Sequence, residues 1–389
     1  MRTALQVGMI GCAFHAPRNH DTASLEEAVH QATHNALRDA GLAIDDIDGI
    51  VVAANDQYDG RAISIMAASG SVGGVGRDIL CTPSCGEHAF VLAALRVGAG
   101  QFRTQLVVSW SSLETTTLSE AQRLGTDPYF HRQLPIDDLS SHGMQANALE
   151  ARVPGARDAA IAVTAGSRKH AAIAYPEFSA GPVDPRVIAS SRVVRWPLTE
   201  GMVSQPAFAV VAVVLGSDAF IAERGIGQPA WIHGMGWATE PGFLGDRDLA
   251  ELPSLRSAAQ QAYGAAGITQ AESAFDVAEV ADASPYQQLL ALEALGLCQA
   301  DAWQACIGRG DFRSGGRLPV NPSGGALSFN PVFCAGLMRI AEAGNQVRGQ
   351  AGRHQVADVT KALAHGASGF AMQYNTVVVF GRDRKEVQQ

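Results

Sequence analysis

Apolar residues recur along the chain with two spacings, which predict alternating strands and helices. Residues 5–11 form a short, nearly continuous apolar run that is typical of a buried strand. In residues 25–40 the apolar side chains return every three or four positions, which places them on one face of a helix. Ser24 and Glu27 have the spacing of a capping box at its start, and Gly41 has the residue type that often ends a helix. The chain therefore begins as strand, then helix.

The stretch around Cys85 predicts a loop, a helix and a strand. Residues 90–97 carry apolar side chains at helical spacing, Gly98 ends this pattern, and residues 106–110 form the next apolar run. Cys85 is expected in the first turn of the helix, where unpaired backbone N–H groups and the positive end of the helix dipole favour a thiolate. Cys85 is therefore a candidate nucleophile. The alternative is a small buried apolar residue.

Residues 115–205 differ from the rest because they are rich in polar residues, proline and arginine. Two helices are expected here. One includes residues 147–152, and the other runs from about Asp158, a suitable N-cap, to Ala174. We interpret the segment as an insertion over a sheet, where lids and substrate loops are usually found.

The order of elements in the first half recurs in the second. Residues 40–51 and 266–280 share a helix end, a glycine, an acidic turn and a strand. The helix after Cys85 has a counterpart after Asn330. The strands predicted at residues 106–110 and 208–215 likewise have counterparts at residues 362–365 and 376–380, in the same order along the chain.

This repeat predicts two similar α/β halves, residues 1–225 and 226–389, that stack into a duplicated α/β/α/β/α five-layer sandwich. A duplication also brings equivalent helix starts together. The candidate site is therefore expected where the helix starts near Cys85 and Asn330 meet, between the halves.

Composition excludes several classes of function. The chain has 389 residues, 47% of them hydrophobic, and a net charge of −9, which argues against non-specific nucleic-acid binding. The apolar run at residues 207–215 is too short to span a bilayer, and residues 1–15 lack the features of a signal peptide. The six cysteines are dispersed, so we expect a reduced, cytoplasmic protein without a metal. His30 and His34 lack a third ligand nearby and are expected to be exposed.

Four motifs occur in an order that agrees with the repeat: Ser84-Cys85-Gly86, the leucine-rich residues 289–298, Asn321-Pro322-Ser323-Gly324-Gly325, and the glycine loop at residues 366–369. Together they resemble the thiolase superfamily, most of all its sterol carrier protein-type branch, over nearly the whole chain. The resemblance implies the five-layer fold, a CoA thioester as substrate with no further cofactor, Cys85 as acyl acceptor, and a homodimer or dimer of dimers.

Two motifs depart from the family pattern. Where these thiolases have a Gly-His-Pro histidine that activates the cysteine, this chain has Asn330. The family's His-Asp-Cys-Phe motif is here Ala281-Asp282-Ala283-Ser284, so both of its proton-handling and oxygen-binding side chains have become alanine. A Claisen thiolase needs a nucleophile, a base for it and a second acid/base. Asn330 can hydrogen-bond an oxyanion but cannot take a proton.

Other residues are candidates for the missing proton transfer, each with a structural role as its alternative. His142 lies in the part of the insertion that resembles the substrate loop, and His365 is expected near the floor of the site. His88 lies one turn after Cys85, and Tyr286 follows the altered motif. The expected catalytic residues are Cys85, His142, Asn330 and His365. The expected substrate-binding residues are Ser84, His88, Asp282, Tyr286, Gly324, Gly325 and Phe329.

Three functions are compatible with these motifs. The first is an enzyme that makes or breaks a carbon–carbon bond beside an acyl-CoA carbonyl, with Cys85 as acyl acceptor. The second is a retro-aldolase like the steroid side-chain aldolases of this branch, which work with a small zinc-ribbon/OB-fold acyl-CoA-binding partner. The loss of both histidines favours this second function, whereas the retained cysteine favours the first. The third is a non-catalytic subunit of a mixed complex.

Overall fold

The computed structural model describes residues 5–17, 23–60, 63–112 and 117–385, so residues 115–116 of the expected insertion lie outside the described part. The strands are β1 (Val7–His15), β2 (Gly49–Ala53), β3 (Asp78–Thr82), β4 (Thr104–Ser111), β5 (Val193–Arg195), β6 (Leu198–Thr199), β7 (Ala209–Ser217), β8 (Ala230–Thr239), β9 (Val277–Glu279), β10 (Lys361–Ser368) and β11 (Tyr374–Gly381).

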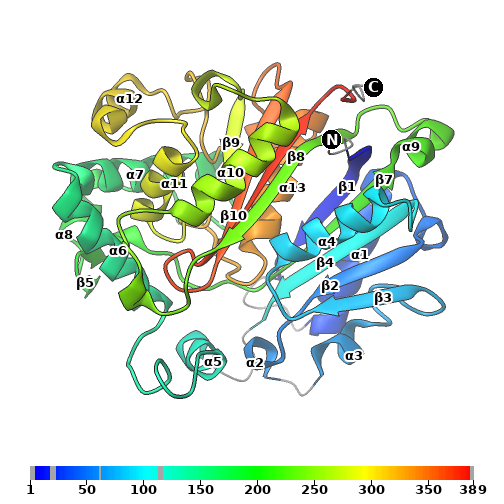
Figure 1. The fold of residues 1–389 in the computed structure, drawn as a ribbon, viewed down its shortest axis with the longest axis horizontal. Coiled ribbons are helices and arrows are strands. Elements are labelled where there is room, and N and C mark those ends of the chain that lie inside the picture. Colours follow the sequence, from blue (N-terminus) through cyan, green and yellow to red (C-terminus); the bar gives the residue numbers. More distant parts are fainter. Residues whose placement is uncertain (1–4, 18–22, 61–62, 113–116, 386–389) are drawn as a thin grey trace.

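The α-helices are α1 (Leu25–Ala40), α2 (Asp56–Asp59), α3 (Ser64–Ala68), α4 (Gly86–Gly98), α5 (Leu118–Gly125), α6 (Asp138–Arg152), α7 (Ala156–Ala174), α8 (Pro185–Ser190), α9 (Asp218–Arg224), α10 (Pro253–Ala266), α11 (Pro285–Ala294), α12 (Trp303–Arg309) and α13 (Ala335–Arg348). Figure 1 shows α6, α7 and α8 gathered at one end of the molecule, beside α11 and α12.

The strand order confirms the internal duplication. Within the described residues, the main sheet has the order β3-β2-β4-β7-β1-β8-β11-β10-β9. In the first half β2 and β4 are parallel, while β4, β7 and β1 are antiparallel neighbours. The second half repeats this arrangement with β9, β10, β11 and β8. Two residue pairs between β1 and β8 join the halves, so the fold has the predicted repeat of a mixed α/β unit.

The helices and half-sheets form five layers, and three apolar clusters of buried side chains hold these layers together. Helix α1 packs on one outer face against β1 and β7, and α10 packs on the other outer face against β8 and β11. Between the half-sheets, α4 and α13 contact each other and the inward faces of both halves. The predicted five-layer sandwich is therefore confirmed. Gly234 and Gly236 of β8 let α10 approach closely. An added Cβ at these positions would lie 2.1 and 2.0 Å, respectively, from a carbonyl oxygen of α10.

Several element boundaries differ from those predicted. The capping box at Ser24 and the left-handed end at Gly41 are as expected for α1. Helix α7 begins after Gly155, however, so Asp158 lies in its first turn and is not its N-cap. Strand β8 was not predicted, because glycines interrupt its apolar residues.

Three further observations concern membranes, metals and cysteines. No described helix has the length and apolar character needed to cross a bilayer. Across the described ranges, no three His, Cys, Asp or Glu side chains are grouped to hold a metal ion. His30 and His34 are exposed and stack on each other, and all six cysteines are free thiols.

Candidate functional site

Cys85 lies at the N-cap of α4, where the chain leaves an extended conformation (φ −66°, ψ 165°) and enters the helix. The next residue is Gly86, and only glycine fits there, because an added Cβ would lie 2.8 Å from Leu337 of α13 and 3.0 Å from Ser109 of β4. Its N–H donates to the carbonyl of Phe333, in the turn before α13, at 3.3 Å. The starts of the two central helices therefore meet, as the duplication predicts.

A cavity of about 460 Å³ opens at this meeting point. It is lined by Cys85 from the first half, by Asp138 and His142 from α6, and by Asp282 and Asn330 from the second half. Three segments far apart in the sequence thus contribute to one site. The cavity also reaches Ala281 and Ala283, whose side chains are single methyl groups.

The surroundings of Cys85 favour the protonated form of its thiol. Burial raises its pKa well above the usual value, and the carboxylate of Glu87 raises it further, while the Ser368 hydroxyl opposes the shift. The expected lowering of the Cys85 pKa by the helix terminus is therefore outweighed. Glu87 is itself buried, and neither of its carboxylate oxygens has a hydrogen-bond partner among the described residues. An unpaired buried anion is costly and acts strongly on its neighbours.

His142 faces an acidic partner one helical turn earlier. Its Nε2 lies 3.4 Å from Oδ1 of Asp138, and both side chains line the cavity. The start of α6 is fixed by Asp137, whose side chain accepts from the N–H of Ser140 at 2.8 Å. The N–H of Asp138 also donates to Oε1 of Gln122, at 3.0 Å. The insertion thus brings a positioned histidine to the cavity, and the catalytic role of His142 stays a prediction.

Asn330 lines the cavity but does not belong to a helix. Its carbonyl accepts from the N–H of Ala207 at 2.9 Å, and α13 begins only at Ala335, after the turn that starts at Pro331. The expectation that Asn330 sits at the helix N-terminus is wrong, because Pro331 to Cys334 form that turn first. Asn330 still lines the same cavity as Cys85.

Asp282 anchors the loop that follows β9. Its Oδ1 accepts from the N–H of Ala326 at 2.6 Å, and burial raises its pKa to about 6 although Arg339 and the backbone amides lower it. Gly325 has φ +64°, and an added Cβ there lies 1.9 Å from Oδ2 of Asp282. Gly324 has φ +95° and lies against Ala171. The two glycines thus shape the loop around Asp282 and are not among the residues that line the cavity.

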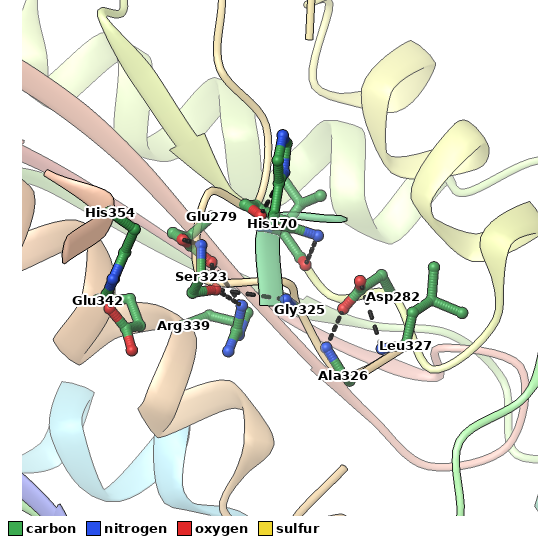
Figure 2. A network of polar contacts seen from close by, with 12 residues as sticks. His170, Glu279, Asp282, Ser323, Gly325, Ala326, Leu327, Arg339, Glu342 and His354 are labelled. Atoms are coloured by element: carbon green, nitrogen blue, oxygen red, sulfur yellow. Dashed lines mark hydrogen bonds and ion pairs between the residues drawn. The ribbon is translucent and has the colours of Figure 1, made fainter. Parts of the chain in front are cut away.

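A buried charged network lies behind Asp282 (Figure 2). Arg339 of α13 contacts Oε2 of Glu279 at 2.5 Å and Oγ of Ser323 at 2.6 Å. One turn further along α13, Glu342 binds Nε2 of His354 at 2.8 Å. Arg339 borders the cavity at Cys85, whereas Glu342 and His354 line a separate cleft of about 390 Å³. The network fixes α13 against β9 at the back of the site.

His365, expected near the site floor, points away from the cavity. Along β10 the side chains alternate, and Gly366 is the residue that faces Glu87 and α13. His365 therefore faces the α10 layer, where its Nε2 lies 2.9 Å from Oδ1 of Asn375, which in turn donates to Ser254. Burial lowers its pKa to about 4. Its predicted catalytic role is not supported by this placement.

The remaining candidates support the site from outside. Tyr286 is buried and donates its hydroxyl to Glu150 of α6. Phe329 packs on Phe178 with ring centroids 5.1 Å apart. Neither residue lines the cavity, nor does His88.

His88 instead contacts two residues that line the cavity, Ser84 and Tyr374. Its Nδ1 is hydrogen-bonded to Oγ of Ser84, and its ring meets that of Tyr374 at 5.8 Å. Ser84 was predicted, whereas Tyr374, Tyr58 and Gln122 were not. No motif marks these three, because short segments distant in sequence bring them to the cavity.

Comparison with known proteins identifies the fold family. Residues 238–382 match the family model described as thiolase C-terminal domain-like. The chain is 30% identical over 216 residues, 55% of its length, to the benzoylsuccinyl-CoA thiolase subunit BbsB of Thauera aromatica. It is 33% identical over 160 residues, 40% of its length, to sterol carrier protein 2 of Homo sapiens. Residues 238–382 therefore resemble the C-terminal domain of thiolases, and part of the chain is similar in sequence to thiolases and sterol carrier protein 2. It covers 56% of the first relative and 29% of the second.

Two solved structures share the fold of this chain. The Ltp2-ChsH2(DUF35) aldolase superposes with a TM-score of 0.79 at 22% identity, over 98% of this chain and 99% of that chain. A monomeric SCP2-thiolase like protein type 1 from Mycobacterium smegmatis superposes with a TM-score of 0.74 at 19% identity, over 100% of this chain and 80% of that chain. At these identities the likeness establishes the fold alone.

Proposed function

We propose that the cavity binds an acyl-CoA thioester and that the protein breaks or forms the carbon–carbon bond next to the thioester carbonyl. Of the routes open to a thiolase-like protein, aldol-type cleavage of a 3-hydroxyacyl thioester fits the geometry best. The observation that carries this choice is the His142–Asp138 pair in the same cavity as Cys85, whose thiol pKa is raised by burial and by Glu87.

The residues divide the reaction as follows. With Nε2 of His142 toward Asp138, Nδ1 is left to accept the proton of the 3-hydroxyl group. The C2–C3 bond breaks as C3 becomes a carbonyl, and its electron pair moves to C2 and the thioester oxygen as an enolate. The Asn330 amide donates a hydrogen bond to that oxygen. The imidazolium, stabilised by Asp138, then returns the proton to C2.

The test is to incubate the protein with a panel of 3-hydroxyacyl-CoA thioesters and to follow release of the aldehyde or ketone and of the shortened acyl-CoA. His142→Gln should lose about 10²–10⁴-fold in rate, because a general base is removed. Asn330→Ala should lose on the order of 10²-fold, one oxyanion donor. Cys85→Ala should keep most of the activity. Loss of activity in Cys85→Ala with an unchanged His142→Gln would contradict the proposal.

Acyl transfer through Cys85 is the second candidate, favoured by the position of Cys85 at a helix N-terminus inside the cavity. On this route a small acyl-CoA adds one acyl mass to the protein and releases free CoA. Cys85→Ser abolishes the adduct. Mass spectrometry of the intact protein separates the two candidates, since aldol cleavage leaves the mass unchanged.

A partner protein is part of the proposal. One similar structure is named as the two-component Ltp2-ChsH2(DUF35) aldolase, and the relative BbsB is named as a subunit. We infer that a small zinc-ribbon/OB-fold protein that binds acyl-CoA assists this chain. If the chain is instead a non-catalytic subunit, co-expression with the partner yields a complex that binds acyl-CoA and remains inactive. A cytoplasmic location stays a prediction.

A further inference from the structure

The short helix α2 places Tyr58 at the cavity. Asn55 caps α2 by accepting from the N–H groups of Gln57 at 3.0 Å and Tyr58 at 3.3 Å. The Asn55 side-chain amide also donates to the carbonyl of Pro83 at 3.2 Å, so it ties α2 to the segment that ends at Cys85. The ring of Tyr58 packs on Phe333 with centroids 5.4 Å apart. Its position relative to Cys85 is therefore fixed from two sides.

Three polar side chains, those of Cys85, Gln122 and Asp138, act on the hydroxyl of Tyr58. Burial, Cys85 and Asp138 raise its pKa, and the Gln122 side chain lowers it by hydrogen bonding. Because Oε1 of Gln122 accepts from the N–H of Asp138, the NH₂ group of Gln122 is the part left for the phenol oxygen. The phenol oxygen then acts as acceptor, and its own proton remains to be donated. Among the described residues, the Tyr58 hydroxyl donates no hydrogen bond to the protein, and Tyr58 lines the cavity.

We infer that Tyr58 is a specificity-determining residue whose hydroxyl donates a hydrogen bond to an oxygen on C3 of the bound acyl group. The inference rests on the proposed function, because it requires an acyl-CoA in the cavity. It assigns Tyr58 a part in choosing the substrate: acyl thioesters oxygenated at C3 gain a partner for that oxygen. A saturated acyl chain leaves the hydroxyl unpaired in a desolvated site, which costs binding energy.

The test compares two ligands that differ only at C3, acetoacetyl-CoA and butyryl-CoA, by calorimetric titration of the full chain. The wild type should bind acetoacetyl-CoA about tenfold more tightly, as one hydrogen bond in a desolvated site supports. Tyr58→Phe should bind the two ligands with equal affinity. Gln122→Leu, which leaves Tyr58 in place but unoriented, should reduce the preference by about threefold. The exposed Tyr129 supplies a matched control, and Tyr129→Phe should keep the full preference.

The outcomes separate the inference from the proposed function. Equal binding of both ligands by the wild type, or a full preference in Tyr58→Phe, would overturn the role of Tyr58 while the acyl-CoA site stands. Failure of the wild type to bind either ligand would overturn both. Circular dichroism and thermal melting of Tyr58→Phe serve as the folding check, since the ring and its packing on Phe333 are retained in this variant.

Discussion

The buried carboxylate of Glu87 affects the pKa of the Cys85 thiol. Glu87 lies in the first turn of α4 and packs against Gly336, where an added Cβ would lie 2.3 Å from its Oε2. The positive ends of α4 and α13 both lie near this carboxylate and offset part of its burial cost. The same negative charge disfavours a thiolate at Cys85. A cysteine at a helix start is therefore insufficient evidence for a nucleophile when a buried acid follows two residues later.

This pairing predicts the sign of a substitution effect. Glu87→Gln removes the charge that raises the Cys85 pKa, so alkylation of Cys85 by iodoacetamide at pH 8 should be faster than in the wild type. The gain is about tenfold for each unit by which the pKa falls. The rate is measured by peptide mass spectrometry, with the exposed Glu177→Gln as control. An unchanged or slower rate in Glu87→Gln would show that Glu87 does not control the thiol.

At the scale of elements, local sequence patterns predicted most helices and strands. They did not always predict which side chains of an element face the site. The capping box at Ser24 and the repeated order of helices and strands along the chain followed from sequence spacing. The face that His365 presents depends on which residue of β10 meets α13, and only the contact of Gly366 with Glu87 decides this. Tyr58 could not be predicted either, because four residues of α2 carry no periodicity. Its place depends on the tertiary bond from Asn55 to Pro83.

Two glycines give opposite expectations for substitution by alanine. Gly325 has φ +64° and no room for a Cβ beside Asp282, so Gly325→Ala should destabilise the protein by more than about 1 kcal/mol. Gly264 lies inside α10 with nothing within 4 Å of an added Cβ, so Gly264→Ala should stabilise it by about 1 kcal/mol. Chemical denaturation measures both. The same sign of effect at both positions would contradict the loop geometry around Asp282.

At the scale of the whole molecule, the Glu342–His354 pair ties α13 to the segment at Gly352–His354 and links stability to pH. Burial opposes the charge of His354, but its hydrogen bond to Glu342 raises the pKa above 6.5. Burial also opposes the charge of Glu342, but His354 lowers its pKa below 4.5. The His354 contribution is complete below pH 6.5 and is lost as pH rises through the raised pKa. The Glu342 contribution is complete above pH 4.5 and is lost as pH falls through the lowered pKa.

His354→Gln should therefore destabilise the protein most between about pH 4.5 and 6.5, by about 3 kcal/mol, because the buried Glu342 carboxylate loses its ionic partner and keeps the hydrogen bond from the Tyr175 hydroxyl. Thermal melting across a pH series measures this. The double variant His354→Gln with Glu342→Gln should lose that pH dependence, and the exposed His30→Gln should behave as the wild type. A penalty of equal size from pH 4 to pH 9 would mean that packing, not charge, holds this segment.

The edge of the sheet at β3 predicts a dimer. One side of β3 pairs with β2, and the other is the outer edge of the main sheet. Leu80 on β3 is 41% exposed, so an apolar side chain lies on a strand that, among the described residues, pairs with β2 alone. An edge of this kind tends to pair with another strand. Two copies of the chain related by a two-fold axis satisfy both edges at once, because the same surface meets itself.

Size-exclusion chromatography with light scattering should then give at least twice the mass of one chain. Leu80→Lys should shift the protein towards the monomer, because a charge on an edge strand opposes pairing. Val75→Lys is the matched control, since Val75 is 82% exposed in the loop that leads to β3. The similar structure from Mycobacterium smegmatis is named as monomeric, so the fold alone does not require a dimer. A wild-type monomer at micromolar concentration would contradict the prediction and leave the β3 edge open to a different partner.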